Sequence, residues 1–199
     1  MKPAFSLCVY CASRDGNDPV FLAAAADVGR WIGLHSGQLV YGGGRTGSMG
    51  AVAHAAMTHG AQVIGIIPQA LVSRELANTD CHELHVVETM HERKLAMAER
   101  ADAFLVMPGG IGTLEEFFEI WTWRHLGYHN KPIGLLNTAG YYDSLLGFMH
   151  TSVQAGLVMP AQMQLIQCHA DAPELLQGLI NALGHAPPGL VERPDSPGA

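Results

Sequence analysis

A glycine-rich turn runs directly into a group of carboxylates between Met107 and Glu119, where the chain reads M-P-G-G-I-G-T-L-E-E-F-F-E. Glycines let the backbone approach a ligand closely, and the free amides at the start of a helix bind anions such as phosphate. Carboxylates beside an anion site favour acid–base chemistry or stabilisation of a developing positive charge. The residues that we expect to hold the anion are Gly109, Gly110, Gly112 and Thr113.

A second interpretation of these acids is that they only cap the start of the helix. Glu116 follows Thr113 by three residues, so T-L-E-E fits a capping box that begins a helix at Thr113. Capping accounts for Thr113 and Glu116 together, but it does not account for the glycines before them. By position, Glu115 and Glu116 are nearly equal candidates for a catalytic carboxylate, and Glu119 is compatible with a solvated side chain one turn further on.

A second glycine loop, Y-G-G-G-R-T-G-S-M-G, carries Gly42, Gly44 and Gly47 at the spacing of a dinucleotide-binding fingerprint. That fingerprint needs an acidic residue about 20 positions on to hold the ribose hydroxyls. No acid occurs between Gly47 and Arg74, so we expect neither a nicotinamide nor a flavin cofactor. The loop remains suited to binding an anion through its amides, and the alternative is a tight turn with close helix–strand packing.

Two adjacent cations, Arg93 and Lys94, lie in the first turns of a helix that opens at T-M-H-E-R-K. Cations are unfavourable there because the helix dipole places partial positive charge at the N-terminus. This local conflict indicates a reason outside the helix for Arg93 or Lys94, with an ordinary exposed basic pair as the equally weighted alternative.

The remaining metal-ligating residue types do not form a convincing site, and we expect no metal. Cys8 and Cys11 form C-x-x-C, but Cys8 falls inside a predicted strand, which favours two small buried side chains. The H-E-L-H segment at 82–85 lacks the spacing of a zinc helix. His125 and His129 have no visible third ligand.

Composition bounds the class of protein. The chain has 199 residues, of which 48% are hydrophobic and 15% charged, and its formal net charge is -7. A net negative charge argues against a nucleic-acid binder, and no apolar stretch is long enough to span a membrane. Four cysteines without regular spacing favour a reducing compartment, so we expect a cytoplasmic protein.

The elements that must position these residues alternate between short apolar runs and longer amphipathic segments. The expected strands are Phe5–Tyr10, Gln38–Tyr41, Ala61–Ile67, Leu84–Val87, Ala103–Met107, Pro132–Leu136 and Gln164–Cys168. The expected helices are Pro19–His35, Gly47–His59, Met90–Ala101, Thr113–Leu126, Tyr142–Gln154 and Pro173–Leu183. This alternation predicts an α/β fold, Rossmann-like and doubly wound, with a mostly parallel sheet covered by helices on both faces. We expect one domain over residues 1–185 and a mobile Pro/Gly-rich tail over 186–199.

Ligands of such open sheets bind beyond the C-terminal ends of the strands. The segment C-A-S-R-D-G follows the first strand, and the two glycine loops follow the second and fifth. All three segments are therefore predicted to converge on one edge of the sheet.

Together, M-H-E-R-K (Met90–Lys94), P-G-G-I-G-T-L-E-E and Y-G-G-G-R-T-G-S-M-G strongly resemble the motifs of the LOG (Lonely Guy) family. V-Y-C-A-S-R near the N-terminus and K-P-I-G-L-L-N (Lys131–Asn137) extend the resemblance over about residues 5 to 155. Members of this family are cytokinin riboside 5'-monophosphate phosphoribohydrolases, once labelled lysine decarboxylases. The upstream loop departs from the family pattern at Arg45-Thr46 and Ser48, and Ile111 replaces a frequent tyrosine, which leaves the preferred base open.

The resemblance implies a Rossmann-like fold, usually a homodimer, that hydrolyses the N-glycosidic bond of adenosine-type nucleoside 5'-monophosphates. We expect no cofactor. By position, Arg93 and Glu116 match the family's catalytic pair, while the glycines and threonine of the second turn match its phosphate site. The other residues that the resemblance implies lie near the nucleotide are Ser13, Gly43, Gly44, Met90 and Lys94. A non-catalytic nucleotide-binding module is the alternative, in which Glu116 only caps a helix. A lysine decarboxylase would need pyridoxal phosphate on one of the few lysines, which are Lys2, Lys94 and Lys131.

Overall fold

The computed structural model describes residues 2–72 and 76–183, so the tail predicted over 186–199 lies outside the described residues. Seven strands form one sheet in the order β4-β3-β2-β1-β5-β6-β7, and every neighbouring pair is parallel. The strands are β1 (Ser6–Tyr10), β2 (Gln38–Tyr41), β3 (Gln62–Pro68), β4 (Glu83–Val87), β5 (Ala103–Val106), β6 (Ile133–Leu136) and β7 (Ile166–His169). The predicted parallel α/β architecture is confirmed.

The α-helices are α1 (Val20–Leu34), α2 (Gly47–Thr58), α3 (Met90–Arg100), α4 (Ile111–His125), α5 (Asp143–Gln154), α6 (Pro160–Met163) and α7 (Ala172–Leu183). Two short 3-10 helices, Gln69–Leu71 and Thr138–Gly140, complete the described elements. Most predicted bounds are confirmed to within two residues. The short α6 was not expected, because its four residues are too few to give a periodic pattern.

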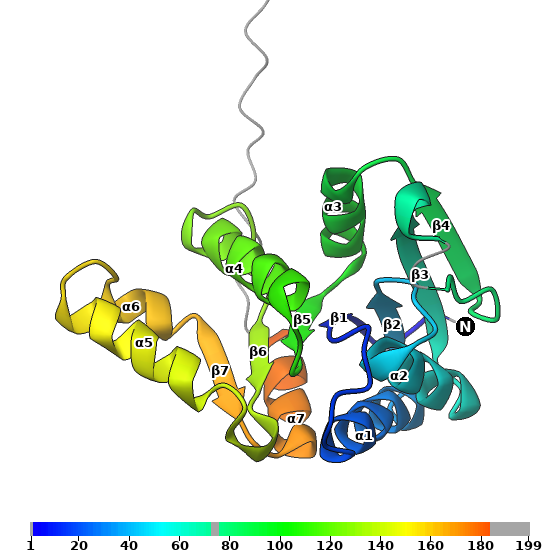
Figure 1. Ribbon diagram of the computed structural model, residues 1–199, viewed down its shortest axis with the longest axis horizontal. Helices are drawn as coiled ribbons and strands as arrows, with labels where there is room; N and C mark the ends of the chain where they lie inside the picture. Colours follow the sequence, from blue (N-terminus) through cyan, green and yellow to red (C-terminus); the bar gives the residue numbers. More distant parts are fainter. Residues whose placement is uncertain (1, 73–75, 184–199) are drawn as a thin grey trace, which may run out of the picture.

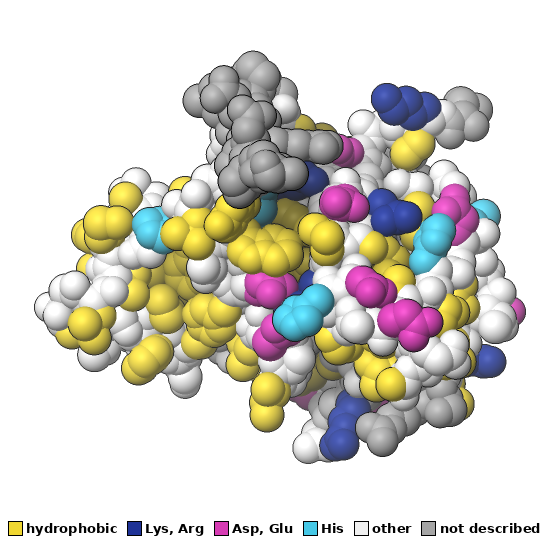
Figure 2. All heavy atoms as spheres, turned by 90° about the horizontal axis from the view of Figure 1, so that it is seen from above, with side chains coloured by type: hydrophobic (Ala, Val, Ile, Leu, Met, Phe, Trp, Pro, Cys, Tyr) yellow, Lys and Arg dark blue, Asp and Glu magenta, His cyan; other side chains and the backbone are white. Residues whose placement is uncertain are grey.

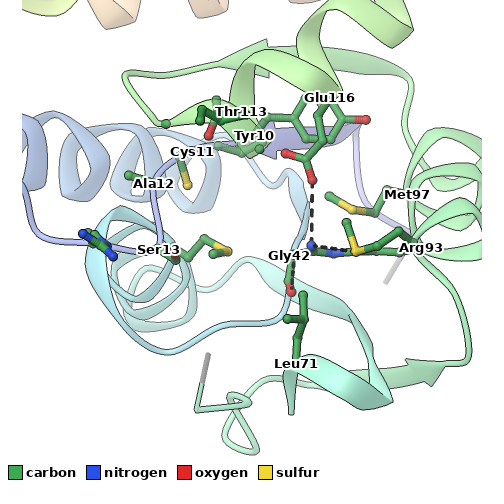
Figure 3. Close-up of a pocket in the computed structure, with 17 residues that line it drawn as sticks. Tyr10, Cys11, Ala12, Ser13, Gly42, Leu71, Arg93, Met97, Thr113 and Glu116 are labelled. Carbon is green, nitrogen blue, oxygen red and sulfur yellow. Dashed lines mark hydrogen bonds and ion pairs between the residues drawn. The ribbon is translucent and has the colours of Figure 1, made fainter. Parts of the chain in front are cut away.

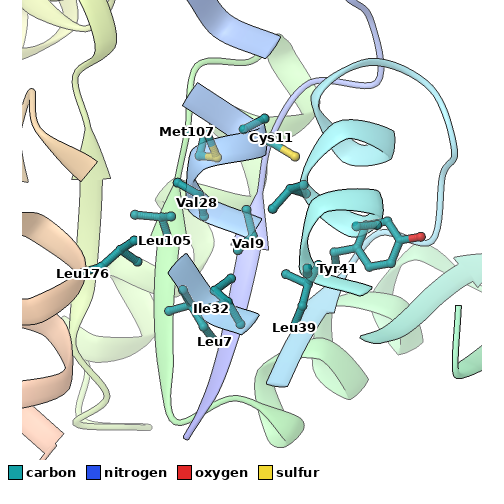
Figure 4. Close-up of a cluster of buried hydrophobic side chains, with 14 of the residues drawn as sticks. Leu7, Val9, Cys11, Val28, Ile32, Leu39, Tyr41, Leu105, Met107 and Leu176 are labelled. Atoms are coloured by element: carbon teal, nitrogen blue, oxygen red, sulfur yellow. The ribbon is translucent and has the colours of Figure 1, made fainter. Parts of the chain in front are cut away.

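Alternate residues of each strand point to opposite faces, and each face has its own buried cluster. Leu7 and Val9 of β1 pack with α1, α2 and α7, and Figure 4 shows these side chains beside Val28 and Ile32 of α1. Cys8 and other residues of the opposite phase pack with α3, α4 and α5. Figure 1 shows the same two layers, with α1, α2 and α7 below the sheet and α3 and α4 above it.

The strand order reverses direction beside β1. The chain moves outward from β1 to β4 on one side, and then returns to place β5 against the other side of β1. The loops that leave β1 and β5 lead to helices on opposite faces, α1 and α4. Such a switch point leaves a crevice beyond the strand ends, where ligands of doubly wound sheets bind.

The helix α3 starts at a side-chain N-cap, Thr89. Thr89 accepts a hydrogen bond from the backbone nitrogen of Glu92 at 3.1 Å, and the Glu92 carboxylate accepts one from the backbone nitrogen of Glu88 at 3.0 Å. The first bond satisfies an orphan amide of the first turn, the second holds the residue that precedes the cap, and together they define where the helix begins. They thereby fix the position of Arg93 one residue later.

No helix within residues 2–72 and 76–183 combines the length and the apolar character needed to cross a membrane.

His129 gives the fold a pH dependence. Its Nε2 lies 3.0 Å from the carbonyl oxygen of Ile120, and its Nδ1 accepts from the backbone nitrogen of Lys131 at 3.2 Å, so the neutral ring with the proton on Nε2 fits both contacts. Burial, assisted by the charges of Lys131 and Arg124, lowers the pKa of His129 from 6.5 to about 4. A lowered folded-state pKa gives stability that is present above pH 6.5 and is lost as the pH falls through 4.

We therefore expect the free energy of unfolding to fall by about 1–3 kcal/mol between pH 6.5 and 4, after allowance for the partial exposure of the ring. Urea unfolding at several pH values measures this slope. His129→Gln keeps an amide donor for the Ile120 carbonyl but does not titrate, so its slope should be flatter. The exposed His125→Gln is the matched control, and an unchanged slope in His129→Gln would contradict the assignment.

Candidate active site

A cavity of about 400 Å³ opens at the C-terminal edge of the sheet, beside the switch point. Its wall comes from the loop after β1, the residue directly after β2, one face of α3 and the first two turns of α4 (Figure 3). The prediction that the segments following β1, β2 and β5 converge at one edge is therefore confirmed. These segments carry most of the residues that the sequence singles out for chemistry.

Glu116 and Arg93 face each other from two different helices. Oε1 of Glu116, on α4, lies 3.9 Å from Nη1 of Arg93, on α3, and Figure 3 shows the two side chains meeting at the cavity. Both residues are buried, with relative exposures of 8% and 5%. Burying an ion pair contributes little net stability, because both charges lose their hydration. Its position beside a cavity therefore favours a chemical role over a structural one.

Arg93 is anchored by the strand ends as well as by the carboxylate. Its Nε donates to the carbonyl oxygen of Ile66 in β3 at 3.1 Å, and its Nη2 donates to that of Gly42 after β2 at 2.9 Å. Gly42 must lack a side chain, because a Cβ there would overlap Nη2 of Arg93. The planar guanidinium is thus held in one orientation with Nη1 directed to Glu116.

Lys94 has a different environment from its neighbour. Its ammonium group is buried and donates to Oε1 of Glu115 and, at 3.0 Å, to Oε1 of Glu119. Burial alone would lower the pKa of Lys94, but the hydrogen bonds and charges of these two acids outweigh it and raise the pKa. Lys94 thus joins α3 to α4 and is not among the described residues that line the cavity.

The contacts of Lys94 distinguish Glu115 from Glu116, which their positions in the sequence could not separate as candidates for the catalytic carboxylate. Glu115 is half exposed and binds Lys94, whereas Glu116 is buried and lines the cavity. Glu119, which was compatible with a solvated side chain, is paired with Lys94. Arg93 and Lys94 are both buried and both reach carboxylates of α4, so the alternative of an ordinary exposed basic pair is wrong.

The prediction of a capping box at Thr113 is wrong. α4 begins at Ile111, its N-cap is Gly110, and no side chain caps it. Thr113 lies inside the first turn and Glu116 in the second. Helix capping therefore does not explain Glu116.

The start of α4 presents open backbone to the cavity. Gly110, Ile111, Gly112 and Thr113 line it, and a Cβ on Gly110 or Gly112 would meet nothing within 4 Å. The first amides of a helix have no intrahelical acceptors and carry the positive end of the helix dipole. Gly109 faces the other way, because a Cβ there would overlap Thr113. The turn thus has the geometry of an anion-binding helix terminus.

The remaining predicted residues divide between the cavity and its supports. Ser13 and Met90 line the cavity, and the Sδ of Met90 lies 3.9 Å from Nη1 of Arg93. Gly43 and Gly44 shape the loop behind it. Gly43 has a φ of +77° and accepts a hydrogen bond from the backbone nitrogen of Asn78, while Gly44 pairs with Ala77.

Further residues that line the cavity, among them Leu71, Met97 and Arg14, were not singled out as site residues from the sequence. Leu71 comes from a 3-10 helix whose approach depends on the path of the chain after β3. Met97 was detectable, because it lies one turn after Arg93 on the same face of α3. Arg14 adds a second cation to the wall, and it is exposed.

The cysteines and the histidine that formed no convincing metal or redox site in the sequence are buried or hydrogen-bonded within the fold. Cys8 and Cys11 are both buried and free, and burial raises the pKa of the Cys8 thiol. His82 accepts a hydrogen bond from the backbone nitrogen of Val63. Within residues 2–72 and 76–183, no group of three or more histidine, cysteine or acidic residues could hold a metal ion.

Known proteins resemble this chain both in its sequence motifs and in its fold. The family model described as "Possible lysine decarboxylase" matches residues 49–179. The "Probable cytokinin riboside 5'-monophosphate phosphoribohydrolase LOG4" of Oryza sativa subsp. japonica is 45% identical over 180 residues, which are 90% of this chain and 78% of that protein. The corresponding LOG3 protein of Arabidopsis thaliana is 44% identical over 173 residues, 87% of this chain and 80% of its own.

Among solved structures, the molybdenum cofactor carrier protein of Chlamydomonas reinhardtii resembles the chain with a TM-score of 0.67 and 21% identity. The match covers 93% of this chain and 99% of the carrier protein. At this level of identity the likeness concerns the fold alone.

Proposed function

The chain belongs to the LOG family of cytokinin riboside 5'-monophosphate phosphoribohydrolases, and on that premise we propose that it hydrolyses the N-glycosidic bond of adenosine-type nucleoside 5'-monophosphates. The products are the free base, adenine or a cytokinin, and ribose 5-phosphate. One observation carries the proposal: the buried Glu116–Arg93 pair and the open start of α4 face the same cavity. We assign the catalytic roles to Glu116 and Arg93.

The start of α4 is the proposed phosphate site. Its amides, aided by the hydroxyl of Thr113, would bind the phosphate oxygens, and Ser13 approaches from the loop after β1. From Thr113 to Glu116 the helix rises by about 4.5 Å. A nucleotide whose phosphate lies at the helix start therefore has its ribose beside the Glu116 carboxylate. Binding the phosphate thus orients the anomeric carbon for reaction.

Glu116 acts on the sugar in this proposal. Cleavage of the bond between the anomeric carbon and the base nitrogen builds positive, oxocarbenium-like charge on the ribose. The Glu116 carboxylate stabilises that charge and takes a proton from the attacking water, whose oxygen forms the new bond to the anomeric carbon. The electron pair of the broken bond leaves with the base, which gains a proton. Arg93, whose Nη1 lies 3.9 Å from Oε1 of Glu116, holds this carboxylate in position.

The decisive experiment incubates the protein with AMP and, separately, with isopentenyladenosine monophosphate. Chromatography quantifies the free base, and a coupled assay quantifies ribose 5-phosphate. We expect equal molar amounts of base and ribose 5-phosphate from at least one substrate, and the ratio of the two rates gives the base preference. Nucleotide binding without release of base from either substrate would leave the non-catalytic module as the function.

Lysine decarboxylation is a weaker proposal, although it stands in the description of the matching family model. The usual cofactor of that reaction forms a Schiff base with a lysine at the site. Lys94 is bound to two carboxylates, and Nζ of Lys131 donates to the carbonyl oxygen of Ala98 at 2.7 Å. Neither of them, nor the exposed Lys2, is among the described residues that line the cavity.

We also propose that the protein forms a homodimer. Figure 2 shows hydrophobic side chains gathered on the side of the molecule formed by α4, α5 and α6. Large exposed hydrophobic residues between α4 and α6 include Leu126, Tyr128, Phe148, Leu157 and Met159. Apolar surface of this kind marks interaction sites. Sedimentation velocity should give twice the mass of one chain. Phe148→Glu should shift the protein toward the monomer. A parent protein that sediments as a monomer would contradict the proposal.

A cytoplasmic location is the last part of the proposal. All four cysteines are free, which suits a reducing compartment. Cell fractionation with markers for soluble and secreted proteins would test it, and recovery in the secreted fraction would contradict it.

A further inference from the structure

Two consecutive tyrosine hydroxyls hold the backbone of the turn that precedes α4. Oη of Tyr141 donates to the carbonyl oxygen of Gly109 at 2.7 Å, and Oη of Tyr142 donates to that of Met107 at 2.7 Å. Both acceptors belong to the short segment that links β5 to α4. Both donors come from the connection between β6 and α5, about thirty residues further along the chain.

The connection that carries the tyrosines is itself firmly shaped. The side chain of Asn137 accepts from the backbone nitrogen of Tyr142 at 2.7 Å and donates to Asp143 at 2.7 Å. Ala139 has a φ of +52°, a left-handed conformation that residues with a side chain adopt only when their surroundings impose it. The ring of Tyr142 is fully buried. The hydroxyls are therefore presented from a rigid support.

The turn is held from its other side by α4. A Cβ on Gly109 would overlap Thr113, so the backbone of the turn lies directly against the first turn of the helix. The ring of Tyr141 packs edge-on against Phe21 of α1, with centroids 5.5 Å apart. The glycine turn is thus held between the two tyrosines and Thr113. We call this set of contacts the clasp. Glycine-rich backbone without such contacts samples many conformations, and ordering it on binding weakens affinity.

We propose that Tyr141 and Tyr142 are positioning residues for the phosphate: their hydroxyls fix the turn before α4 so that the first helix amides are aligned before the ligand arrives. This inference rests on the proposed function for the identity of the ligand. It explains why hydroxyls, and not only aromatic rings, occur at these two positions. Burial raises the pKa of Tyr142, which keeps its hydroxyl in the protonated form that donates.

Tyr141→Phe tests the proposal because it removes one hydroxyl and keeps the ring. Tyr141 is 45% exposed, so water can reach the Gly109 carbonyl and the fold is expected to persist. We expect ribose 5-phosphate to bind about fivefold more weakly by calorimetry, the size of one hydrogen bond, while adenine, which has no phosphate, binds as before. Tyr128→Phe is the matched control, since Tyr128 is exposed beyond the far end of α4.

Parent-like binding of ribose 5-phosphate by Tyr141→Phe, or equal weakening of both products, would overturn the proposal. Hydrogen exchange measured on the peptide covering 107–113 separates this inference from the proposed function. Faster exchange in Tyr141→Phe and Tyr142→Phe than in the parent supports the clasp even if the parent releases no base from nucleotide, a result that would refute only the proposed function. Unchanged exchange in both variants would refute the clasp itself.

Discussion

Glu116→Gln should lower the rate of base release by about 10²–10⁴-fold, because the amide has the shape of the carboxylate but neither its negative charge nor its basicity. Glu116 is the one acid among the described residues that line the cavity. Arg93 keeps its bonds to the carbonyl oxygens of Ile66 and Gly42 in the variant, so the fold should remain. The measurement is the initial rate of base release at saturating nucleotide, with thermal unfolding of the same sample as a check on folding.

Glu115→Gln is the matched control for this prediction. Glu115 is adjacent in the chain and of the same chemical type, but it binds Lys94 and is half exposed. Its variant should retain a rate close to that of the parent. A catalytic role for Glu116 would be untenable if the control lost activity while Glu116→Gln kept it.

Gly42→Ala should have the second largest effect, although it adds a single methyl group. The added Cβ would overlap Nη2 of Arg93 and would lie 2.9 Å from Sδ of Met49. The guanidinium cannot simply move aside, because Ile66, Gly42 and Glu116 hold it in three directions. A displacement of about 1 Å at a catalytic group can lower the rate about 10²-fold. We also expect a loss of about 1–3 kcal/mol in the free energy of unfolding, as for other overpacked sites.

The kinetic and stability effects are measured by base release and by chemical unfolding. Gly147→Ala provides the control, since a Cβ there meets nothing within 4 Å and the residue lies inside α5. That variant should be as active as the parent and as stable or slightly more so, given the higher helix propensity of alanine. If Gly42→Ala turned over nucleotide at the parent rate, the orientation of Arg93 would not matter for the reaction.

Much of this fold was predictable because continuous apolar strands and longer periodic helices leave strong local patterns. The strand Gln38–Tyr41 has the predicted bounds, and the convergence of the loops after β1, β2 and β5 follows from parallel strands alone. The order of the strands was not predictable, because it depends on which buried faces meet across the whole chain. The pairing of β1 with β5 is the contact that places the cavity.

The candidate site shows where local patterns mislead. A threonine followed by glutamate after three residues occurs twice near the cavity, at Thr89 and at Thr113. Only Thr89 caps a helix; at Thr113 the preceding glycines let the helix begin earlier. Spacing also could not separate Arg93 from Lys94, because adjacent residues on a helix point about 100° apart and only the packing of α3 against α4 decides which one meets the cavity.

The position of β5 beside β1 has a consequence for the protein while it is being synthesised. Until Ala103–Val106 has left the ribosome, one side of β1 remains an edge strand with unpaired backbone groups, although β2 can already cover its other side. The emerging N-terminal half thus exposes a hydrophobic edge, S-L-C-V-Y, that another nascent chain can pair with. The arrival of β5 closes this edge and places the start of α4, which follows it in the chain, beside the loop after β1, so the contact that protects β1 also prepares the proposed catalytic centre.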